Sequence, residues 1–264
     1  MELFRFTPGS TPLLVSMPHP GTYLPDGVAE HLTDEARLVP DTDWHLERLY
    51  DFAAALGAGV LAATHSRYLV DLNRPPDNRP LYPGAANTGL CPTELFDGGP
   101  LYLPGQEPDA AEVGARLERY WRPYHERLEA ELAALKESFG VAVLFEAHSI
   151  RSRLPRYFEG RLPDLNLGSA AGASAAPELE ARLFSLCAGA SGYSSVLNGR
   201  FTGGYTTRHY GRPADAVHAL QLELAQTTYM DETPPFAFDE ARAAHLRPLL
   251  RALLEEARDW ALGD

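Results

Sequence analysis

The amino-acid sequence predicts an α/β fold: a single domain with a central, mostly parallel or mixed β-sheet flanked by helices. Apolar runs of strand length alternate along the chain with longer segments of helical period. The 264 residues suit one large domain, and neither an internal repeat nor a linker-like change of composition divides them. Hydrophobic residues make up 45% of the chain, enough for a substantial core. We therefore expect residues 1–264 to form one domain.

The first hundred residues combine strand-like runs, one helix and a long loop. Three apolar runs predict strands, at Leu13–Met17, Gly59–Thr64 and Tyr68–Leu72. Apolar residues at three- and four-residue spacing predict a helix over Asp43–Leu56, which Gly57 would end. Residues 73–105 are rich in Pro, Gly and Asn and have little periodicity. An irregular stretch of this length is usually functional or packed over a site.

The remainder of the chain alternates helices with strands. A helix is expected at roughly residues 109–139, kinked or divided at Pro123 and ended by Gly140. Val141–Phe145 is almost wholly apolar, as in a strand buried within a parallel sheet. Further along we expect a loop over 150–175, a helix near 177–187, strands at Tyr193–Leu197 and Val217–Leu224, and a closing helix over Asp239–Leu262 that is interrupted at Pro248.

Charge and composition exclude several classes of partner. The formal net charge of −13 argues against nucleic acid and anionic membranes, because both are bound mainly through Lys and Arg. A small anionic substrate stays possible, since a few arginines can dominate the potential of a pocket. The N-terminal segment has no secretion signal, and no window approaches the ~18 apolar residues of a membrane span. Two cysteines, Cys91 and Cys187, favour a reduced, cytoplasmic protein, and the oligomeric state stays open.

Two histidines lie at the ends of predicted strands. His19 follows Leu13–Met17, and His148 ends the run that begins at Val141. Ligands of open α/β sheets bind beyond the carboxyl ends of the strands, so both histidines are expected at one edge. Glu146 shares a strand face with His148 and can orient its imidazole. A lone histidine is more often a satisfied core residue, whereas two at equivalent strand ends indicate a metal site.

The third metal ligand is expected to be a carboxylate. A catalytic zinc usually has three protein ligands and a fourth position for water. The segment Asp41-Thr-Asp43-Trp-His45 precedes the predicted helix, where one Asp can serve as the N-cap and a second needs another role. We select Asp43, with Asp41, His45 and Glu146 as the alternatives.

The last predicted strand and several loops supply further polar groups. Glu223 shares a strand face with Gln221 between leucines, and its buried carboxylate beside a metal could move a proton from water to a leaving amine. Arginines in strand-end loops could clamp an acidic substrate, with surface ion pairs as the alternative for each one singly. They are Arg67, Arg74 and Arg208. The segment Thr202–Gly211 resembles a loop that covers a substrate.

Six segments in the same order resemble the N-formylglutamate amidohydrolase (deformylase) family. They are Ser16–Thr22, Arg67–Arg74, Glu146–Ser149, Asp164–Gly168, Gly203–Gly211 and Gln221–Ala225. The Val-Asp-Leu-Asn-Arg string that ends at Arg74 and the string Gly203–Gly211 are specific, whereas Pro-His-Pro-Gly alone would be weak. The resemblance implies hydrolysis of N-formyl-L-glutamate to formate and L-glutamate in histidine degradation. It also implies a fold similar to zinc carboxypeptidases and aspartoacylase-like deacylases.

The resemblance assigns roles by position. His19 and His148 match the metal-binding histidines, and Glu223 matches the general base. Thr22 stands where the relatives carry an acid three residues after the first histidine, so Asp43 is inferred from the family's Asp before its first helix. We expect zinc or another divalent metal, an oxyanion stabilised by Arg67, and an anionic N-acyl amino acid as substrate. The residues expected to contact that substrate are Asn73, Arg74, Tyr205, Thr206, Arg208 and Gln221.

Two other functions stay open from the sequence. One is a zinc-dependent deacylase or carboxypeptidase that acts on another N-acyl amino acid with the same metal chemistry. The second is a non-catalytic protein that binds acidic metabolites through its arginines. Glu223 has no obvious purpose in such a binding protein, which favours the enzyme.

Overall fold

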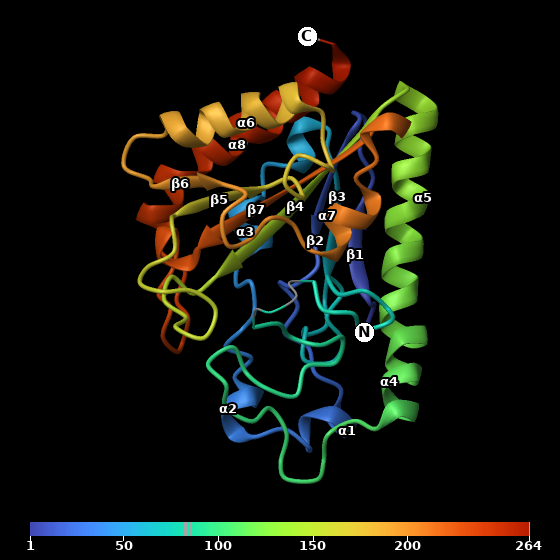
Figure 1. The fold of residues 1–264 in the computed structure, drawn as a ribbon, viewed down its shortest axis with the longest axis vertical. Helices are drawn as coiled ribbons and strands as arrows, with labels where there is room; N and C mark the ends of the chain where they lie inside the picture. The colour runs from blue at the N-terminus through green and yellow to red at the C-terminus, as the bar shows by residue number, and fades with distance from the viewer. Residues whose placement is uncertain (82–83, 85, 264) are drawn as a thin grey trace.

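A seven-stranded mixed sheet forms the centre of the computed structural model, which describes residues 1–81, 84 and 86–263 (Figure 1). In spatial order the strands are β1 (Phe4–Thr7), β3 (Gly59–Ala63), β2 (Leu13–Met17), β4 (Ala142–Ile150), β7 (Val217–Ala225), β5 (Leu165–Gly168) and β6 (Ser195–Leu197). The four central strands β3, β2, β4 and β7 run parallel. β1 and β5 pair antiparallel to their central neighbours, and β6 runs parallel to β5. The predicted α/β fold with a mixed sheet is confirmed.

Helices cover both faces of this sheet and bury two apolar clusters. On one face lie α6 (Pro177–Gly189) and α8 (Glu240–Leu262), and on the other lie α4 (Ala110–Arg116) and α5 (Arg122–Phe139). Side chains alternate between the faces: Leu13 and Val15 of β2 join the first cluster, and Leu14 joins the second. All three are almost fully buried, which accounts for the unbroken apolar run in the sequence.

The long helix expected over residues 109–139 is present with an irregular middle. Asp109 caps α4 by accepting a hydrogen bond from the Glu112 backbone N–H, and Gly140 ends α5 in the left-handed conformation with φ of 77°. Between α4 and α5 the chain makes a π-helical turn at Leu117–Trp121. Pro123 lies two residues beyond this turn and has no N–H to donate, so the altered hydrogen bonding falls where the α-helical ladder would be broken. The predicted division at Pro123 therefore takes the form of a π turn.

Several predicted elements are wrong. Tyr68–Leu72 is not a strand, because its five residues lie in a turn-rich segment. The apolar character of this segment reflects its burial, although it does not pair with a neighbouring strand. The helix expected over Asp43–Leu56 is reduced to α3 (Leu46–Leu49) and a 3₁₀ turn at Ala54–Leu56. The substrate-covering loop contains helix α7 (Tyr205–Tyr210), and α8 continues through Pro248 without interruption. The short elements β1, β5, α1 (Asp26–Ala29) and α2 (Asp34–Arg37) carry too few residues to show a period.

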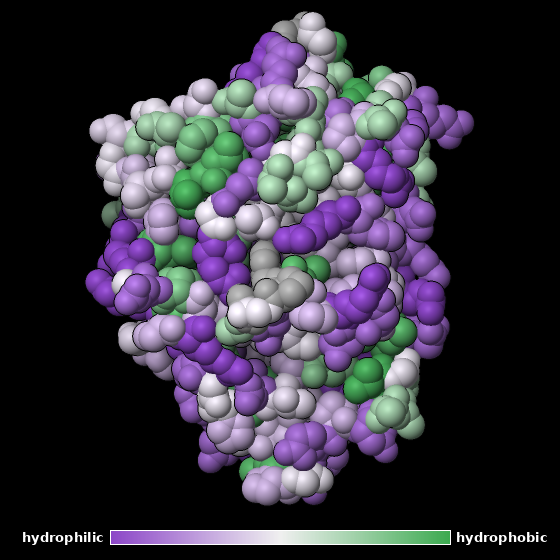
Figure 2. Space-filling view, viewed as in Figure 1, coloured by the Kyte–Doolittle hydropathy of each residue, from purple (hydrophilic) through white to green (hydrophobic). Residues whose placement is uncertain are grey.

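Residues 73–105 form a loop, as expected. The described part of it, 73–81, 84 and 86–105, contains no helix and no strand longer than an isolated bridge, and residues 82, 83 and 85 lie outside the described residues. None of the helices in the described part of the chain has the length and apolar composition needed to cross a membrane. Figure 2 shows hydrophobic residues only in small, separate patches on the face in view, with hydrophilic side chains between them.

A buried histidine links α5 to the loops that carry the polar groups. His125 stacks on Trp121 with ring centroids 3.7 Å apart. Its Nε2 donates to the Leu72 carbonyl oxygen at 2.8 Å, and its Nδ1 lies 2.9 Å from the Tyr210 hydroxyl oxygen. Burial, together with the nearby His209, lowers the pKa of His125 to about 3, although the bond to Leu72 opposes this shift. His125 is therefore neutral in the folded protein near neutral pH.

This neutral histidine predicts a loss of stability on acidification. The unfolded state binds a proton below pH ~6.5 and the folded state does not, so the stability present above that pH is lost as the pH falls toward 3. Between pH 6.5 and 4.5 the free energy of unfolding of the metal-free wild type should fall relative to that of His125→Gln by about 2–3 kcal/mol. Urea denaturation at several pH values measures this difference. The exposed His245→Gln is the control, and a pH-independent difference for His125→Gln would contradict the prediction.

Candidate metal centre and its pocket

The carboxyl ends of the central strands bring the predicted site residues to one edge of the sheet. His19 lies two residues beyond β2. His148 lies within β4, which continues to Ile150, so the predicted placement of this histidine at the strand's end is corrected. β4 and β7 pair in parallel with His148 opposite Glu223 and Glu146 opposite Gln221. This register fixes His148 beside Glu223, and His19 lines the same pocket.

His19 directs a nitrogen without a hydrogen-bond partner into this region. Its Nε2 donates to Asp71 Oδ1 at 2.8 Å, which fixes the tautomer and leaves the Nδ1 lone pair for another group. Nδ1 is buried, has no hydrogen-bond partner and lies 3.7 Å from Asp43 Oδ2. A buried acceptor without a partner is unusual in a native structure. A metal ion would satisfy it.

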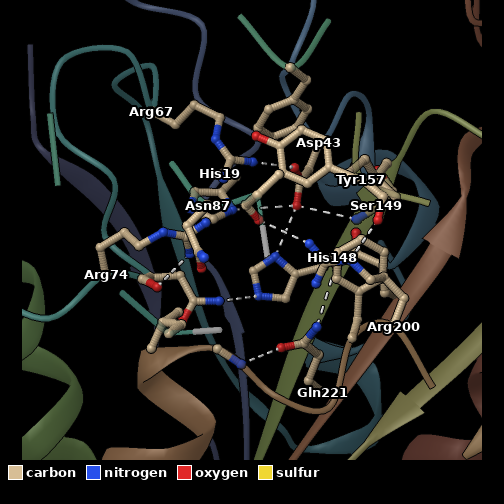
Figure 3. A pocket seen from close by; sticks show the side chains of 18 residues that line it. His19, Asp43, Arg67, Arg74, Asn87, His148, Ser149, Tyr157, Arg200 and Gln221 are labelled. Carbon is tan, nitrogen blue, oxygen red and sulfur yellow. Dashed lines mark hydrogen bonds and ion pairs between the residues drawn. The ribbon is translucent and has the colours of Figure 1, made fainter. Parts of the chain in front are cut away.

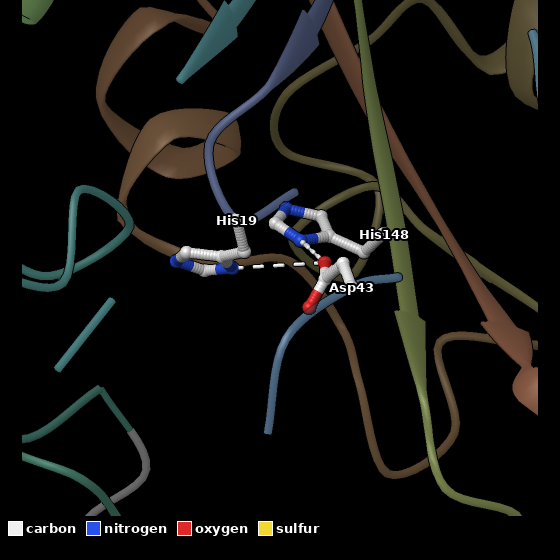
Figure 4. A group of neighbouring side chains, drawn as sticks. All are labelled: His19, Asp43 and His148. Atoms are coloured by element: carbon white, nitrogen blue, oxygen red, sulfur yellow. Dashed lines mark hydrogen bonds and ion pairs between the residues drawn. The ribbon is translucent and has the colours of Figure 1, made fainter. Parts of the chain in front are cut away.

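His148 faces the same carboxylate from the other side (Figure 4). Its Nδ1 donates to Asp43 Oδ2 at 3.0 Å, and its Nε2 lies 3.3 Å from Glu146 Oε2 and 3.1 Å from the Asn73 amide nitrogen. Burial alone would lower the pKa of His148, but the hydrogen bonds with Asp43 and Glu146 raise it to about 10. These carboxylates therefore stabilise a positive charge at this position.

Asp43 completes the group. Ligand atoms of His19, Asp43 and His148 all lie within 4.8 Å of one another, and the three side chains are buried. Burial opposes the charged form of Asp43, but the hydrogen bond with His148 and the nearby His19 imidazole hold the pKa of this carboxyl below its usual value. The Asp43 backbone N–H also donates to the His19 carbonyl oxygen at 3.0 Å, which joins the two segments. Two imidazoles and a carboxylate are the donor set of a catalytic divalent-metal site.

The alternative third ligands have other partners. Asp41 accepts hydrogen bonds from the Tyr68 hydroxyl, the Phe96 backbone N–H and Arg151, and burial raises its pKa. His45 has a left-handed backbone with φ of 61°, and its Nε2 donates to the Phe236 carbonyl oxygen at 2.7 Å. Glu146 lies behind His148 and is fully buried. The geometry thus favours Asp43 over all three.

Asp71 is a site residue that the sequence reasoning did not single out. Its Oδ1 binds His19 and also accepts from the Asn73 backbone N–H at 2.9 Å, and its Oδ2 accepts from the Arg67 guanidinium at 2.7 Å. Arg67 is buried, lies over the Phe96 ring at 4.6 Å and reaches to 3.5 Å from Asp43 Oδ1. The one available signal was the position of Asp71 inside the Val-Asp-Leu-Asn-Arg string.

Glu223 lines the pocket beside the candidate ligands. Burial raises its pKa to about 8, with the charge of Asp43 adding to the rise and those of His148, Arg67 and Arg74 opposing it. The Gln221 amide nitrogen donates to Glu223 Oε2 at 3.4 Å. Gln221 Oε1 in turn accepts from the Gly204 backbone N–H at 2.8 Å, so α7 and β7 position this carboxylate together.

The pocket is lined by some of the residues expected to contact a substrate and not by others (Figure 3). Three arginines line it, Arg67, Arg74 and Arg200, together with Asn73 and Gln221. Residues of the 73–105 loop line it too, namely Leu81, Ala86, Asn87 and Phe96. The loop therefore packs over the site, in agreement with the expectation from its length.

Three residues predicted to contact a substrate lie elsewhere. Arg208 is exposed and donates to the Gly203 carbonyl and the Thr202 hydroxyl. Tyr205 packs its ring against Trp121 and His125. Thr206 donates its backbone N–H and its hydroxyl to Asn73 Oδ1, so it supports a pocket residue from behind. All three belong to helix α7, and none of them lines the pocket.

Arg200 is a pocket residue that the sequence reasoning missed. It follows β6 and meets the same criterion as the other arginines, a cation in a strand-end loop of an acidic chain. The predicted strand at Tyr193–Leu197 could therefore have drawn attention to it.

Comparisons with known proteins point to one family. The model of the family described as N-formylglutamate amidohydrolase matches residues 11–230. An N-formylglutamate deformylase of Pseudomonas aeruginosa is 57% identical over 259 residues, covering 98% of this chain and 97% of the relative. The deformylase of Pseudomonas putida is 54% identical with the same coverage. The crystal structure of N-formylglutamate amidohydrolase from Ralstonia eutropha JMP134 superposes with a TM-score of 0.84 at 26% identity, covering 99% of this chain and 98% of that one.

The two aspartates of the 41–43 segment allow a matched test of the metal centre. Asp43→Asn should lower affinity for a divalent metal by about 100-fold or more, because a neutral amide replaces the carboxylate between two histidines. Asp41→Asn should retain the metal and lose about 1–2 kcal/mol of stability, because one acceptor in its buried network is lost. Metal content by mass spectrometry and urea denaturation measure the two effects. Equal metal content in the two purified variants would exclude Asp43 as a ligand.

Proposed function

Because the chain belongs to the N-formylglutamate amidohydrolase family, we propose that it hydrolyses N-formyl-L-glutamate to formate and L-glutamate at the His19–Asp43–His148 site. The observation that supports this most strongly is the buried acid Glu223 beside two histidines and a carboxylate, in a pocket that also holds three arginines. This combination suits hydrolysis of an anionic amide. We extend the proposal to residues 1–264 as one catalytic domain.

The metal of this proposal is zinc or another divalent ion. The free Nδ1 of His19, the Asp43 carboxylate and the His148 imidazole would hold it, and Asp71 and Glu146 would orient the two imidazoles. A bound divalent ion would polarise the formyl carbonyl and lower the pKa of water in the pocket. Two imidazole nitrogens and one carboxylate oxygen are a donor set that suits zinc.

Glu223 is the proton carrier in this proposal. As a carboxylate it accepts a proton from the attacking water, and as the acid it delivers that proton to the leaving amine nitrogen. Its raised pKa suits both steps, because a group that titrates near neutral pH can take up and release a proton with little cost. Gln221 restricts the carboxyl group through its amide nitrogen.

Arg67 is assigned to the developing oxyanion. It is held rigidly by Asp71 and by the Phe96 ring, so little reorganisation accompanies the reaction. Its charge would stabilise the negative oxygen of the tetrahedral intermediate, and burial of Arg67 strengthens that interaction.

Arg74 is assigned to the α-carboxylate of the substrate. Its guanidinium donates to the carbonyl and hydroxyl of Thr88 and to the Asn73 carbonyl. These acceptors are neutral, so they orient the guanidinium without forming an ion pair with it. Arg74 follows Asp71 and Asn73 in the chain, and these two residues contact the two histidines. Only one carbon separates the α-carboxylate from the scissile amide nitrogen, so the partner of this carboxylate must also lie near the histidines. Arg208, the other arginine considered from the sequence, does not line the pocket.

Glu223→Gln tests the proton transfer. The amide cannot accept the proton from water, so kcat for formate release should fall by roughly 10²- to 10⁴-fold while the metal content stays that of the wild type. The exposed Glu129→Gln on α5 is the matched control and should leave the rate unchanged. Near wild-type formate release from Glu223→Gln would exclude this residue as the proton carrier.

Removal of the metal tests the cofactor separately. Dialysis against a chelator should abolish formate release, and one equivalent of the native ion should restore it. Titration with zinc, manganese, cobalt and nickel, followed by a formate assay, identifies the ion that restores the highest rate at the lowest concentration. Full activity after complete removal of metal would contradict the metal-dependent mechanism.

A further inference from the structure

The proposed substrate carries two carboxylates, and the assignments above account for one of them. An N-acylated glutamate presents an α-carboxylate next to the amide nitrogen and a second carboxylate at the end of its side chain. Burying a carboxylate without a cationic partner is strongly unfavourable. A pocket that accepts this dianion therefore needs a second cation placed away from the first.

Arg67 does not suit this role. Its guanidinium is 2.7 Å from Asp71 Oδ2 and 3.5 Å from Asp43 Oδ1, and only 7% of the side chain is exposed. These contacts fix its position beside the candidate metal ligands, where the reacting amide and not the end of the substrate's side chain is expected to lie.

Arg200 has the required position. It lines the same pocket, and in Figure 3 it lies on the opposite side of His148 from Arg74. Its Nε donates to the Tyr157 carbonyl oxygen at 2.8 Å and its terminal nitrogen to the Ala86 carbonyl oxygen at 3.0 Å. These two contacts hold the guanidinium at the wall of the pocket.

The surroundings of Arg200 also suit a side chain and not the reacting amide. The guanidinium lies 5.3 Å from the centre of the Phe201 ring and 5.7 Å from that of Tyr157, and both aromatic residues line the pocket. Aromatic walls can pack against the methylene groups of a substrate while the arginine meets the charge at their end. The contacts of Arg200 named above are with the 73–105 loop and with Tyr157, whereas Arg74 adjoins the residues that touch the histidines.

We propose that Arg200 binds the side-chain carboxylate of the substrate and thereby makes the pocket selective for an acidic N-acyl amino acid. The inference rests on the proposed function and adds its specificity determinant. Arg74 recognises the carboxylate that every N-acyl amino acid has, and Arg200 recognises the one that only acidic substrates have. Selectivity and catalysis then belong to different arginines.

The experiment compares N-formyl-L-glutamate with N-formyl-L-glutamine, which has nearly the same shape and a neutral side chain. The wild type should prefer the glutamate substrate in kcat/KM by on the order of 100-fold, the usual value of a charge-assisted contact in a pocket. Arg200→Met should remove most of this preference by slowing the glutamate substrate alone. Arg74→Met, the matched control, should slow both substrates by similar factors and keep the preference.

Arg200→Lys guards against a merely structural effect. It retains the charge but not the planar fork, so it should keep a reduced preference for glutamate with an intermediate kcat/KM. An Arg200→Met variant that slows both substrates equally would overturn the inference, because loss of the Tyr157 and Ala86 contacts would then explain the result. A wild type that shows no preference would overturn it as well. A wild type that releases no formate from either substrate contradicts the proposed function itself, and this inference with it.

Discussion

The buried carboxylate of Asp71 is the interaction on which the rest of the site depends. It is fully buried, and a charge in that position is tolerated only when donors satisfy it on all sides. Although burial opposes the charge, Arg67 and Arg74 hold the pKa of Asp71 well below its usual value, so it stays ionised. Its two oxygens are occupied by His19, Arg67 and the Asn73 backbone N–H. The Asp71 carboxylate thereby fixes the tautomer of His19, the direction of the Arg67 guanidinium and the path of the chain that leads to Arg74.

The sheet supplies the second fixed reference. The parallel register of β4 and β7 sets His148 opposite Glu223. Because side chains on one face of a strand repeat every two residues, Glu146 shares the face of His148 and Gln221 shares the face of Glu223. Loops are then tied to this frame by side-chain bonds. Gln221 accepts from the Gly204 backbone N–H, and Asn73 accepts from Thr206, so the start of α7 is anchored at the pocket even though its side chains point elsewhere. The frame is rigid where the chemistry requires distances fixed to a fraction of an ångström.

The sequence alone predicted the strands with a long apolar pattern and the site residues that a rule about strand ends identifies. Strands β2, β4 and β7 were predictable because buried parallel strands are continuously apolar, and the strand-end rule then brought His19, His148 and Glu223 together. It failed where burial mimics a strand, as at Tyr68–Leu72, and where a short glycine-rich segment could be loop or helix, as at α7. Arg208 was chosen and Arg200 overlooked for the same reason. Which of two loop arginines enters a pocket depends on the packing of segments far apart in the chain, and no single-sequence period records that packing.

Chemistry and recognition are therefore carried by different parts of this fold. The groups assigned to the reaction come from strand ends and from the segment that Asp71 holds, where backbone pairing and buried ions restrict movement. The groups assigned to the substrate's side chain come from the loop after β6, from Tyr157 and from the 73–105 loop, which meet through hydrogen bonds to backbone carbonyls. Such contacts keep a cation in place, and loops tolerate replacement better than strands do. A fold arranged in this way can change which acyl amino acid it accepts by altering these loops, because none of His19, Asp43, His148 and Glu223 belongs to them.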